Sequence, residues 1–302
     1  MRVLITGGTG FIGTALCARL RERGHTLAVL SRRPARVPAL CGADVQALAG
    51  LAAVPGFAPE AVVNLSGAPI ASRLWTRARR RLLRDSRIAF TRELVAVLAR
   101  CAQPPQVMVS GSAVGYYGAR GDEPLDEEAD AVNDFPHQLC RDWEQAAQPV
   151  TALGTRLCLL RTGLVLGPGG MLARLLPAFR LGLGGPLGSG QQWMSWIHRD
   201  DLVALIDYLL AHQTLAGPFN GTAPNPVPNH EFTETLARLL KRPARLRLPA
   251  GLLRAALGDL ATLLVDGQRA LPDKALKAGF EFCYSQLDVA LAEILRAPHS
   301  GP

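Results

Sequence analysis

The chain has 302 residues and a formal net charge of +8, and 48% of its residues are hydrophobic. This length and composition exclude a disordered polypeptide and predict one large or two modest globular domains. No apolar run reaches the roughly 18 residues that a membrane span needs, and a core strand beginning at residue 2 argues against a signal peptide. We therefore expect a cytoplasmic protein without a membrane partner.

The cysteines give no sign of a metal site. They stand at positions 17, 41, 101, 140, 158 and 283, with no C-x-x-C pair and no spacing typical of metal ligands. This pattern predicts reduced thiols that serve mostly as packing residues.

The first thirteen residues predict a strand, a glycine turn and a helix in that order. Residues 3–5 form a short apolar strand, residues 6–10 form the turn, and an amphipathic helix begins near Phe11. A second apolar strand at 26–30 comes next. Because the turn lies between a strand and a helix of a βαβ unit, it predicts a dinucleotide site.

Each glycine of the turn has a physical role in such a site. Gly7 allows the tight reversal, Gly10 leaves room for a pyrophosphate at the backbone amides, and Gly13 lets the helix pack close to the strand. The free amides at the helix start attract phosphate. The residues that we expect at the cofactor in this segment are Thr6, Gly7, Gly10, Phe11, Ile12 and Gly13.

The residues after the second strand favour NADP over NAD. This strand is followed by Ser31, Arg32 and Arg33 instead of an acidic residue that would bind a ribose 2′-hydroxyl. Arginine accommodates the 2′-phosphate of NADP. The alternative is that both arginines are solvated loop charges.

A later apolar run ends in polar residues that we also expect beside the cofactor. After a weak strand at 43–48, residues 61–68 form a strand that ends with Asn64, Ser66, Gly67 and Ala68. Ligands bind beyond the carboxyl ends of parallel strands. The alternative is a plain turn at the end of the strand.

Residues 73–101 predict one long helix whose first half is rich in arginine. These arginines are Arg73, Arg77, Arg79, Arg80, Arg81, Arg84 and Arg87. We favour a solvated or acid-paired face, with contact to an anionic substrate as the alternative. We do not expect nucleic acid as a partner, because the aromatic residues near this run are only Trp75 and Phe90.

A buried strand at 107–112 predicts the substrate side of the site. It ends at Ser112 and is followed by Tyr116 and Tyr117, whose hydroxyls would lie where a substrate meets the nicotinamide. A helix at 136–147 and a strand at 157–165 come next.

The rest of the chain predicts a smaller lobe. A glycine-rich segment at 167–190 carries a helix at 172–183, and an edge strand is expected at 193–198. Residues 199–201 are expected to cap a helix that runs to 212. The tail is expected to hold helices capped by Asn229 and started by Gly251, around a strand at 244–248.

We thus predict an α/β fold with a doubly wound, parallel-sheet Rossmann domain and a smaller C-terminal α/β substrate lobe. Residues 1–166 form the NADP-binding domain, to which 199–222 return. Residues 167–198 and 223–302 form the lobe.

Several motifs resemble the extended short-chain dehydrogenases/reductases of the sugar-nucleotide epimerase type, over nearly the whole chain. They are Thr6-Gly-Gly-Thr-Gly-Phe-Ile-Gly13, Asn64-Leu-Ser-Gly67, Ser110-Gly-Ser112 and Trp196-Ile-His-Arg-Asp-Asp-Leu202. Longer strings resemble an atypical subgroup of uncertain activity, often labelled epimerase family proteins. These strings are Ser110-Gly-Ser-Ala-Val-Gly-Tyr-Tyr-Gly118, Leu187-Gly-Ser-Gly190, Gln192-Trp-Met-Ser-Trp-Ile-His198 and Asn220-Gly-Thr-Ala-Pro-Asn-Pro226.

The chain departs from the resembled family at its acid/base positions. The family carries Tyr-x-x-x-Lys-x-x-x-Glu, in which the tyrosine is the general acid/base and the lysine holds the nicotinamide ribose. Alignment on Glu144 places Cys140 at the lysine and Pro136 at the tyrosine. The family's active-site asparagine falls on Arg87, whereas its serine is matched by Ser112.

These observations leave three functional hypotheses. The first is an NADP(H)-dependent oxidoreductase or epimerase for a small polar substrate, with a sugar nucleotide implied only by the resemblance. Its catalytic candidates are Ser112, Tyr116, Tyr117 and Arg87, with Ser112 on a substrate carbonyl and a loop tyrosine or water as proton source. Cys140 would lie beside the nicotinamide ribose without acting as a base. The second is a catalytically silent NADP-binding sensor or scaffold, and the third is a polyanion-binding surface. We expect a monomer or a homodimer.

Overall fold

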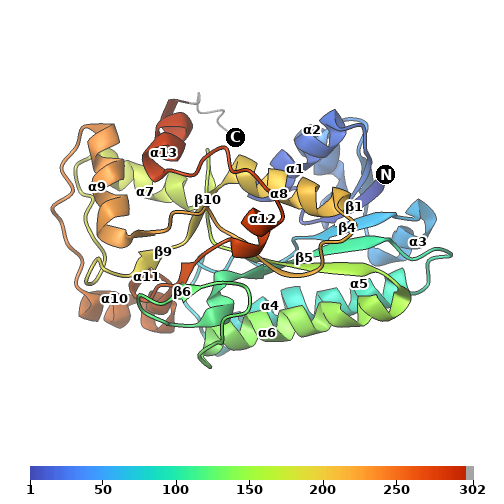
Figure 1. The fold of residues 1–302 in the computed structure, drawn as a ribbon, viewed down its shortest axis with the longest axis horizontal. Helices are drawn as coiled ribbons and strands as arrows, with labels where there is room; N and C mark the ends of the chain where they lie inside the picture. The colour runs from blue at the N-terminus through green and yellow to red at the C-terminus, as the bar shows by residue number, and fades with distance from the viewer. Residues whose placement is uncertain (297–302) are drawn as a thin grey trace.

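The computed structural model describes residues 1–296, so the last six residues of the predicted lobe lie outside the described part. Its centre is a seven-stranded parallel sheet in the order β11-β7-β5-β4-β1-β2-β3 (Figure 1). The strands are β1 (Arg2–Thr6), β2 (Thr26–Leu30), β3 (Gln46–Leu48), β4 (Ala61–Asn64), β5 (Val107–Ala113), β7 (Arg156–Thr162) and β11 (Gly217–Gly221). The strand order reverses between β1 and β4, which is where such sheets bind ligands.

Helices cover both faces of this sheet (Figure 1). One face carries α1 (Phe11–Glu22), α2 (Val37–Cys41) and α8 (Arg199–Ala211). The other carries α3 (Val54–Phe57), α4 (Arg77–Arg84), α5 (Phe90–Leu98) and α6 (Phe135–Ala147). Along β1, Val3 and Ile5 enter the first core and Leu4 enters the second, as the alternation of a strand buried on both faces requires. The predicted doubly wound α/β class is therefore confirmed.

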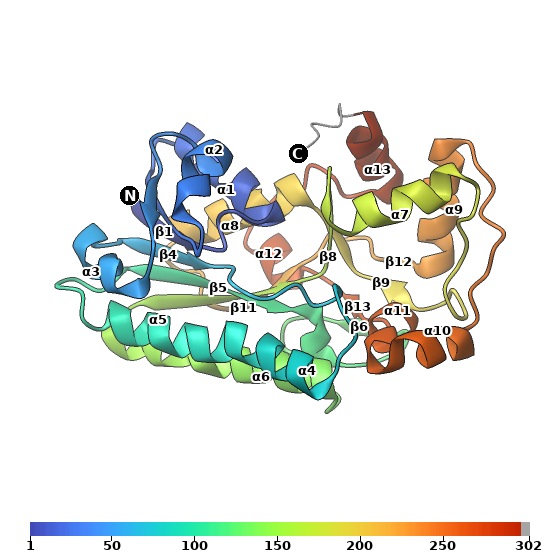
Figure 2. The same cartoon turned by 180° about the vertical axis from the view of Figure 1, so that it is seen from behind.

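Most of the other elements gather at one end of the large sheet (Figure 2), whereas α12 (Asp273–Lys277) packs on the first core beside β11. Three small sheets pair β8 (Leu164–Leu166) with β10 (Trp196–His198), β9 (Trp193–Met194) with β12 (Val227–Pro228), and β6 (Pro124–Leu125) with β13 (Arg269–Ala270). The helices are α7 (Gly170–Arg180), α9 (Asn229–Leu240), α10 (Ala250–Leu257), α11 (Thr262–Val265), α12 (Asp273–Lys277) and α13 (Leu287–Arg296). Side chains of α7, α9 and α13 share a third core. The division into two domains stays a prediction, although α8 and β11 belong to the layers of the large sheet.

Short helical turns join several elements. The 3-10 turns are Pro34–Arg36, Leu51–Ala53, Val114–Tyr117, Gln148–Leu153 and Gly258–Ala261, and Asp85–Ala89 is π-helical. No helix of residues 1–296 combines the length and apolar character of a membrane span.

Two predicted strands are divided in the structure. The strand at 157–165 splits at Gly163, where a Cβ would lie 2.2 Å from the Ser195 carbonyl oxygen, so the chain passes close to its neighbour and changes sheets. The edge strand predicted at 193–198 is divided into β9 and β10 at Ser195, the residue that Gly163 approaches. Residues 244–248 form no strand, and only Leu248 makes a β-bridge, to Leu187.

Several predicted helix boundaries or caps also differ from the observed ones. The helix predicted at 172–183 spans Gly170–Arg180, and the one expected to start at Gly251 begins at Ala250. The helix predicted at 73–101 begins at Arg77, because the Thr76 hydroxyl accepts the Arg79 N–H as an N-cap, and the π-helical segment interrupts it. Helix α8 is capped by His198 rather than by residues 199–201, since its Nδ1 accepts the Asp200 N–H. Helix α9 begins at Asn229 itself, after Pro228.

Candidate functional site

The glycine turn after β1 has the shape of a phosphate loop. Gly7 has φ +73°, and a Cβ there would lie 2.8 Å from the Leu65 carbonyl oxygen. A Cβ on Gly13 would lie 2.4 Å from the Gly7 carbonyl oxygen, so only glycine fits at both positions. Gly10 precedes α1 and supplies no capping side chain, which leaves the first amides of the helix available to a ligand.

Phe11 joins this loop to the glycine-rich segment after β8. A Cβ on Gly167 would approach the Phe11 ring to 3.0 Å, and one on Gly170 would meet the same ring at 3.0 Å. The Arg199 guanidinium lies 5.6 Å from the ring centroid. The glycine-rich segment 167–190 therefore begins packed on Phe11, and Ile12 is half-buried beside the first core.

The arginines at the end of β2 face solvent. Arg32 and Arg33 are exposed, and neither guanidinium forms an ion pair with any residue of the described chain. The Ser31 hydroxyl accepts the Arg33 N–H at 3.1 Å and so shapes the turn. Two free cations at this strand end suit a 2′-phosphate.

The Asn64 side chain is fully buried and bound within the protein. Its Oδ1 accepts the Thr6 hydroxyl at 2.7 Å, and its Nδ2 donates to the Thr91 hydroxyl at 2.9 Å and to the Ser110 hydroxyl at 3.3 Å. Thr6 and Asn64 therefore tie strand ends together. The turn at 66–68 is what can face a cofactor, and the Ser86 hydroxyl accepts the N–H of Ala68 at 3.0 Å.

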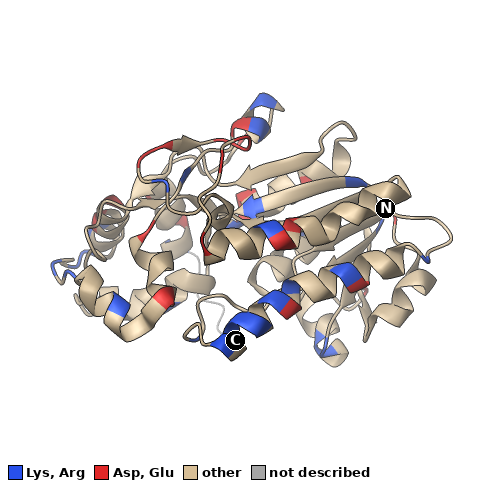
Figure 3. Ribbon diagram, turned by 90° about the horizontal axis from the view of Figure 1, so that it is seen from below, with Lys and Arg blue, Asp and Glu red and all other residues tan. Residues whose placement is uncertain are grey.

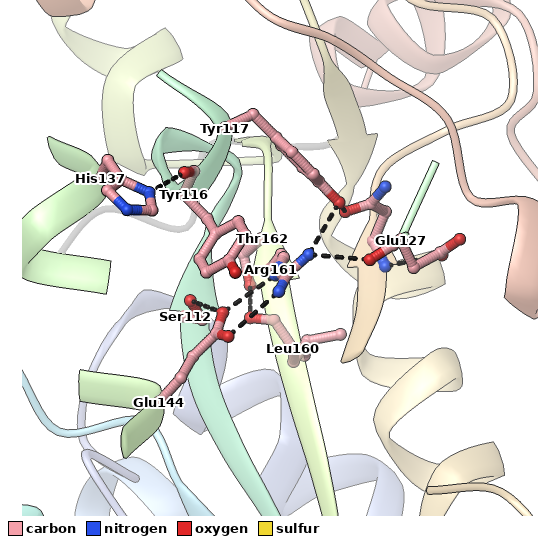
Figure 4. Close-up of polar contacts among 10 residues, drawn as sticks. Ser112, Tyr116, Tyr117, Glu127, His137, Glu144, Leu160, Arg161 and Thr162 are labelled. Atoms are coloured by element: carbon pink, nitrogen blue, oxygen red, sulfur yellow. Dashed lines mark hydrogen bonds and ion pairs between the residues drawn. The ribbon is translucent and has the colours of Figure 1, made fainter. Parts of the chain in front are cut away.

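A buried charge network lies at the end of β5 (Figure 4). The Ser112 hydroxyl donates to Glu144 Oε1 at 2.7 Å. The Arg161 guanidinium binds both oxygens of Glu144, at 2.9 and 3.1 Å. Burial alone would lower the pKa of Arg161, but the ion pair with Glu144 offsets this and raises it. Arg161 therefore stays charged, and its guanidinium pairs with the Glu144 carboxylate.

The two loop tyrosines have different environments (Figure 4). Tyr117 is fully buried, donates to Asn220 Oδ1 at 2.7 Å and accepts from Arg161 at 3.2 Å. Burial raises the pKa of Tyr117 to about 12. Tyr116 is half-buried with its ring 3.5 Å from the Arg161 guanidinium carbon, and its hydroxyl makes no hydrogen bond within residues 1–296. Of the two, only Tyr116 has a hydroxyl free for a ligand.

Cys140 is a buried thiol at this site. It is 5% exposed, and a Cβ on Gly115 of the turn above it would lie 3.9 Å from the sulfur. Burial raises the pKa of Cys140 to about 12, and the neighbouring Glu144 adds to the effect. A thiol in this state is a poor base and a poor nucleophile.

The arginine run divides into paired and unpaired members. Arg80 pairs with Asp259, and Arg84 pairs with Asp142 at 2.6 Å. Figure 3 shows basic and acidic segments side by side along the helices α4, α5 and α6. Arg87 is half-buried and lies against Gly67, where a Cβ would be 2.9 Å from its guanidinium carbon.

Sequence reasoning missed Arg161, Glu127 and Asn220. Glu127 accepts the N–H of Asn220 at 2.9 Å and that of Lys274 at 3.1 Å, and its carbonyl oxygen accepts from Arg161 at 3.1 Å. The available signal was the arginine itself, a charge inside the apolar run 157–165, because a buried charge needs partners.

Comparisons with known proteins place the fold in a family. The NAD dependent epimerase/dehydratase family model matches residues 3–220, and a domain of unknown function matches 248–294. The chain is 42% identical to the epimerase family protein Mb2239 of Mycobacterium bovis over 98% of both chains. It is 40% identical to a chloroplastic SDR39U1 homologue of Arabidopsis thaliana, over 98% of this chain and 87% of that one.

A solved structure agrees with these matches. The crystal structure of human epimerase family protein SDR39U1 (isoform 2) with NADPH superposes with a TM-score of 0.89 at 34% identity, covering 99% of this chain and 100% of that one. The resemblance inferred from the motifs is thereby confirmed. This protein belongs to the NAD dependent epimerase/dehydratase family.

Proposed function

We propose that this protein binds NADPH across the β1/β4 crevice and acts as an NADP-dependent oxidoreductase or epimerase on a small polar substrate. The observation that carries the proposal is the phosphate loop at Gly7–Gly13 followed, at the end of β2, by the unpaired Arg32 and Arg33. The NADPH in the crystal structure of the human relative supports the same cofactor here.

Each part of the cofactor has a candidate contact. Arg32 or Arg33 would hold the 2′-phosphate, and the amides at the start of α1 would hold the pyrophosphate. The turn at 66–68 would line the nicotinamide half, because it follows β4 on the far side of the strand reversal. The bound cofactor would supply or accept a hydride.

Tyr116 is the best candidate for moving a proton. Its hydroxyl is free, whereas the Tyr117 hydroxyl is buried between Asn220 and Arg161. The Ser112 proton is directed to Glu144, so this hydroxyl offers a substrate its lone pairs instead of a donor. A substrate hydroxyl would suit Ser112 better than the carbonyl that sequence analysis assigned to it.

The alternative is a catalytically silent NADP-binding sensor or scaffold. It is favoured by the internal pairing of Ser112, Glu144 and Arg161, which leaves few polar groups facing a ligand. The neutral Cys140 thiol points the same way. The enzyme and the sensor would both bind NADPH, but only the enzyme would convert a substrate.

The test compares Tyr116→Phe with Tyr117→Phe. The protein is incubated with NADPH and a panel of small aldehydes, ketones and keto acids, whose carbonyl groups can accept the hydride, and the loss of NADPH absorbance is followed. The enzyme proposal expects turnover that falls at least tenfold in Tyr116→Phe, as general acid/base groups contribute about 10²–10⁴-fold. Cys140→Ala is expected to change the rate less than about tenfold, since a neutral thiol is a weak donor. Tight NADPH binding without turnover of any compound would favour the sensor.

A further inference from the structure

Arg87 is a cation of the site that has no acidic partner. It lies in the π-helical segment Asp85–Ala89, and its Nη1 donates to the carbonyl oxygen of Leu83 at 3.3 Å. No ion pair joins its guanidinium to a carboxylate in residues 1–296. Arg84, one turn earlier, is paired with Asp142. Of these two arginines, Arg84 therefore has a carboxylate partner, whereas the Arg87 guanidinium has none among residues 1–296.

The guanidinium of Arg87 is held in place by apolar and backbone surfaces. Its carbon lies 5.2 Å from the centroid of the Trp143 ring. On the other side it lies against Gly67, where any side chain would collide with it. Burial removes water from around the guanidinium and so lowers the pKa of Arg87. Holding a cation there without an anion has an energetic cost.

No other group that residues 1–296 place at the site neutralises this charge. The Glu144 carboxylate is occupied by Arg161 and Ser112. Cys140 is a neutral thiol, because its pKa is raised to about 12. Arg79, the other charged group that acts on Arg87, is itself positive. The surroundings of Arg87 thus carry positive charge that no carboxylate of residues 1–296 pairs with.

The position of this charge indicates a ligand contact. Gly67 lies just beyond the carboxyl end of β4, at the edge where doubly wound sheets bind ligands. π-helical turns inside helices often occur at functional sites. We propose that Arg87 binds an oxyanion of the substrate, a carboxylate or a phosphate group, over the turn that follows β4. This inference rests on the proposed function and adds the substrate class, an anionic compound.

The chemistry of arginine fits this role. A guanidinium offers parallel N–H donors that match a carboxylate or phosphate in a bidentate pair. Lysine would keep the charge but lose this planar fork. The Trp143 ring and the Gly67 turn confine the guanidinium before the ligand arrives, which lowers the ordering cost of binding.

The test is calorimetric titration of the NADPH-saturated protein with oxalate and, separately, with inorganic phosphate. Arg87→Met removes the charge, Arg87→Lys keeps it without the fork, and Arg81→Met is the matched control. Arg81 is exposed on α4 and forms no ion pair among residues 1–296. We expect at least one anion to bind the wild type. Its Kd should rise about tenfold or more in Arg87→Met, rise less in Arg87→Lys and stay unchanged in Arg81→Met.

Three results would overturn the inference. The first is no saturable binding of either anion to the wild type, and the second is equal binding to wild type and Arg87→Met. The third is a tenfold rise of the NADPH Kd in Arg87→Met, which would make a cofactor phosphate the occupant. If Arg87→Met does not fold, Arg87→Lys is used instead. Binding of both anions to Arg87→Lys as tightly as to the wild type would then contradict the inference. A wild type that binds no NADPH would instead contradict the proposed function.

Discussion

Replacing Glu144 with glutamine should destabilise the protein strongly. Glu144 lies on α6 and is 9% exposed in its side chain, and its partner Arg161 on β7 is 5% exposed. Glutamine keeps the size and one acceptor oxygen but removes the negative charge. Arg161 would then be a buried cation without a counter-ion, and the Ser112 hydroxyl would lose a charged acceptor.

The magnitude follows from the geometry of this pair. The two N–O distances of 2.9 and 3.1 Å bring the charges to about 4 Å, where the attraction is about 4 kcal/mol at an effective dielectric of about 20. Removal of one partner from a buried pair costs about 3–5 kcal/mol. The total stability of a folded domain is about 5–15 kcal/mol, so this loss is a large fraction of it.

Urea denaturation followed by tryptophan fluorescence measures the change as a difference in extrapolated free energy of unfolding. Glu123→Gln is the matched control, because Arg120 also binds Glu123 through two nitrogens, but at the surface, where the side chain of Glu123 is 48% exposed. Its expected cost is below about 1 kcal/mol. If Glu144→Gln cost no more than Glu123→Gln, the buried pair would not stabilise the fold as argued.

Three further predictions concern the cofactor site and Tyr117. NADPH should bind at least about tenfold tighter than NADH by fluorescence titration, and Arg32→Gln with Arg33→Gln should remove the preference, since a charge-assisted bond contributes about 1.5–3 kcal/mol. Equal Kd values in the wild type would contradict this. Gly10→Val should abolish NADPH binding with little change in the urea midpoint, because its Cβ meets only the Gly7 carbonyl oxygen at 3.2 Å, whereas Gly13→Val should lower the midpoint. Native NADPH affinity in Gly10→Val would show that the phosphate loop is misplaced. The pKa of Tyr117 is raised to about 12 in the fold. Between about pH 10 and 12 only the unfolded chain loses this proton, so the free energy of unfolding should fall by about 2–3 kcal/mol as pH rises. Tyr117→Phe should flatten that slope, and an unchanged slope would refute the assignment.

Local patterns were sufficient to predict the nucleotide half of the fold. The order of strand, glycine turn and helix predicted α1 and β2 at their observed starts, because the turn chemistry and the apolar periodicity act over only a few residues. Gly7 and Gly13 have the close contacts that their places in the turn predicted. The placement of Arg32 and Arg33 at the end of β2 follows from the same local order.

Contacts between distant residues explain what the sequence did not predict. The bonds that occupy Tyr117 come from Arg161 and Asn220, which lie 44 and 103 positions away. Without them both loop tyrosines looked equally able to move a proton. The break of the predicted strand at Gly163 depends on Ser195, and nothing in the run 157–165 alone indicates that approach.

The network joins the stability of this protein to its candidate chemistry. In the resembled family the acid/base pair stands on the helix that corresponds to α6, and alignment on Glu144 predicts Pro136 and Cys140 at its positions, neither of which exchanges a proton near neutral pH. Our proposal assigns the proton to Tyr116, whose ring lies on the Arg161 guanidinium. Glu144 fixes that guanidinium, so it holds the surface on which Tyr116 is oriented. Loss of Glu144 should consequently disturb Tyr116 as well as the core, although it touches no atom of the tyrosine hydroxyl.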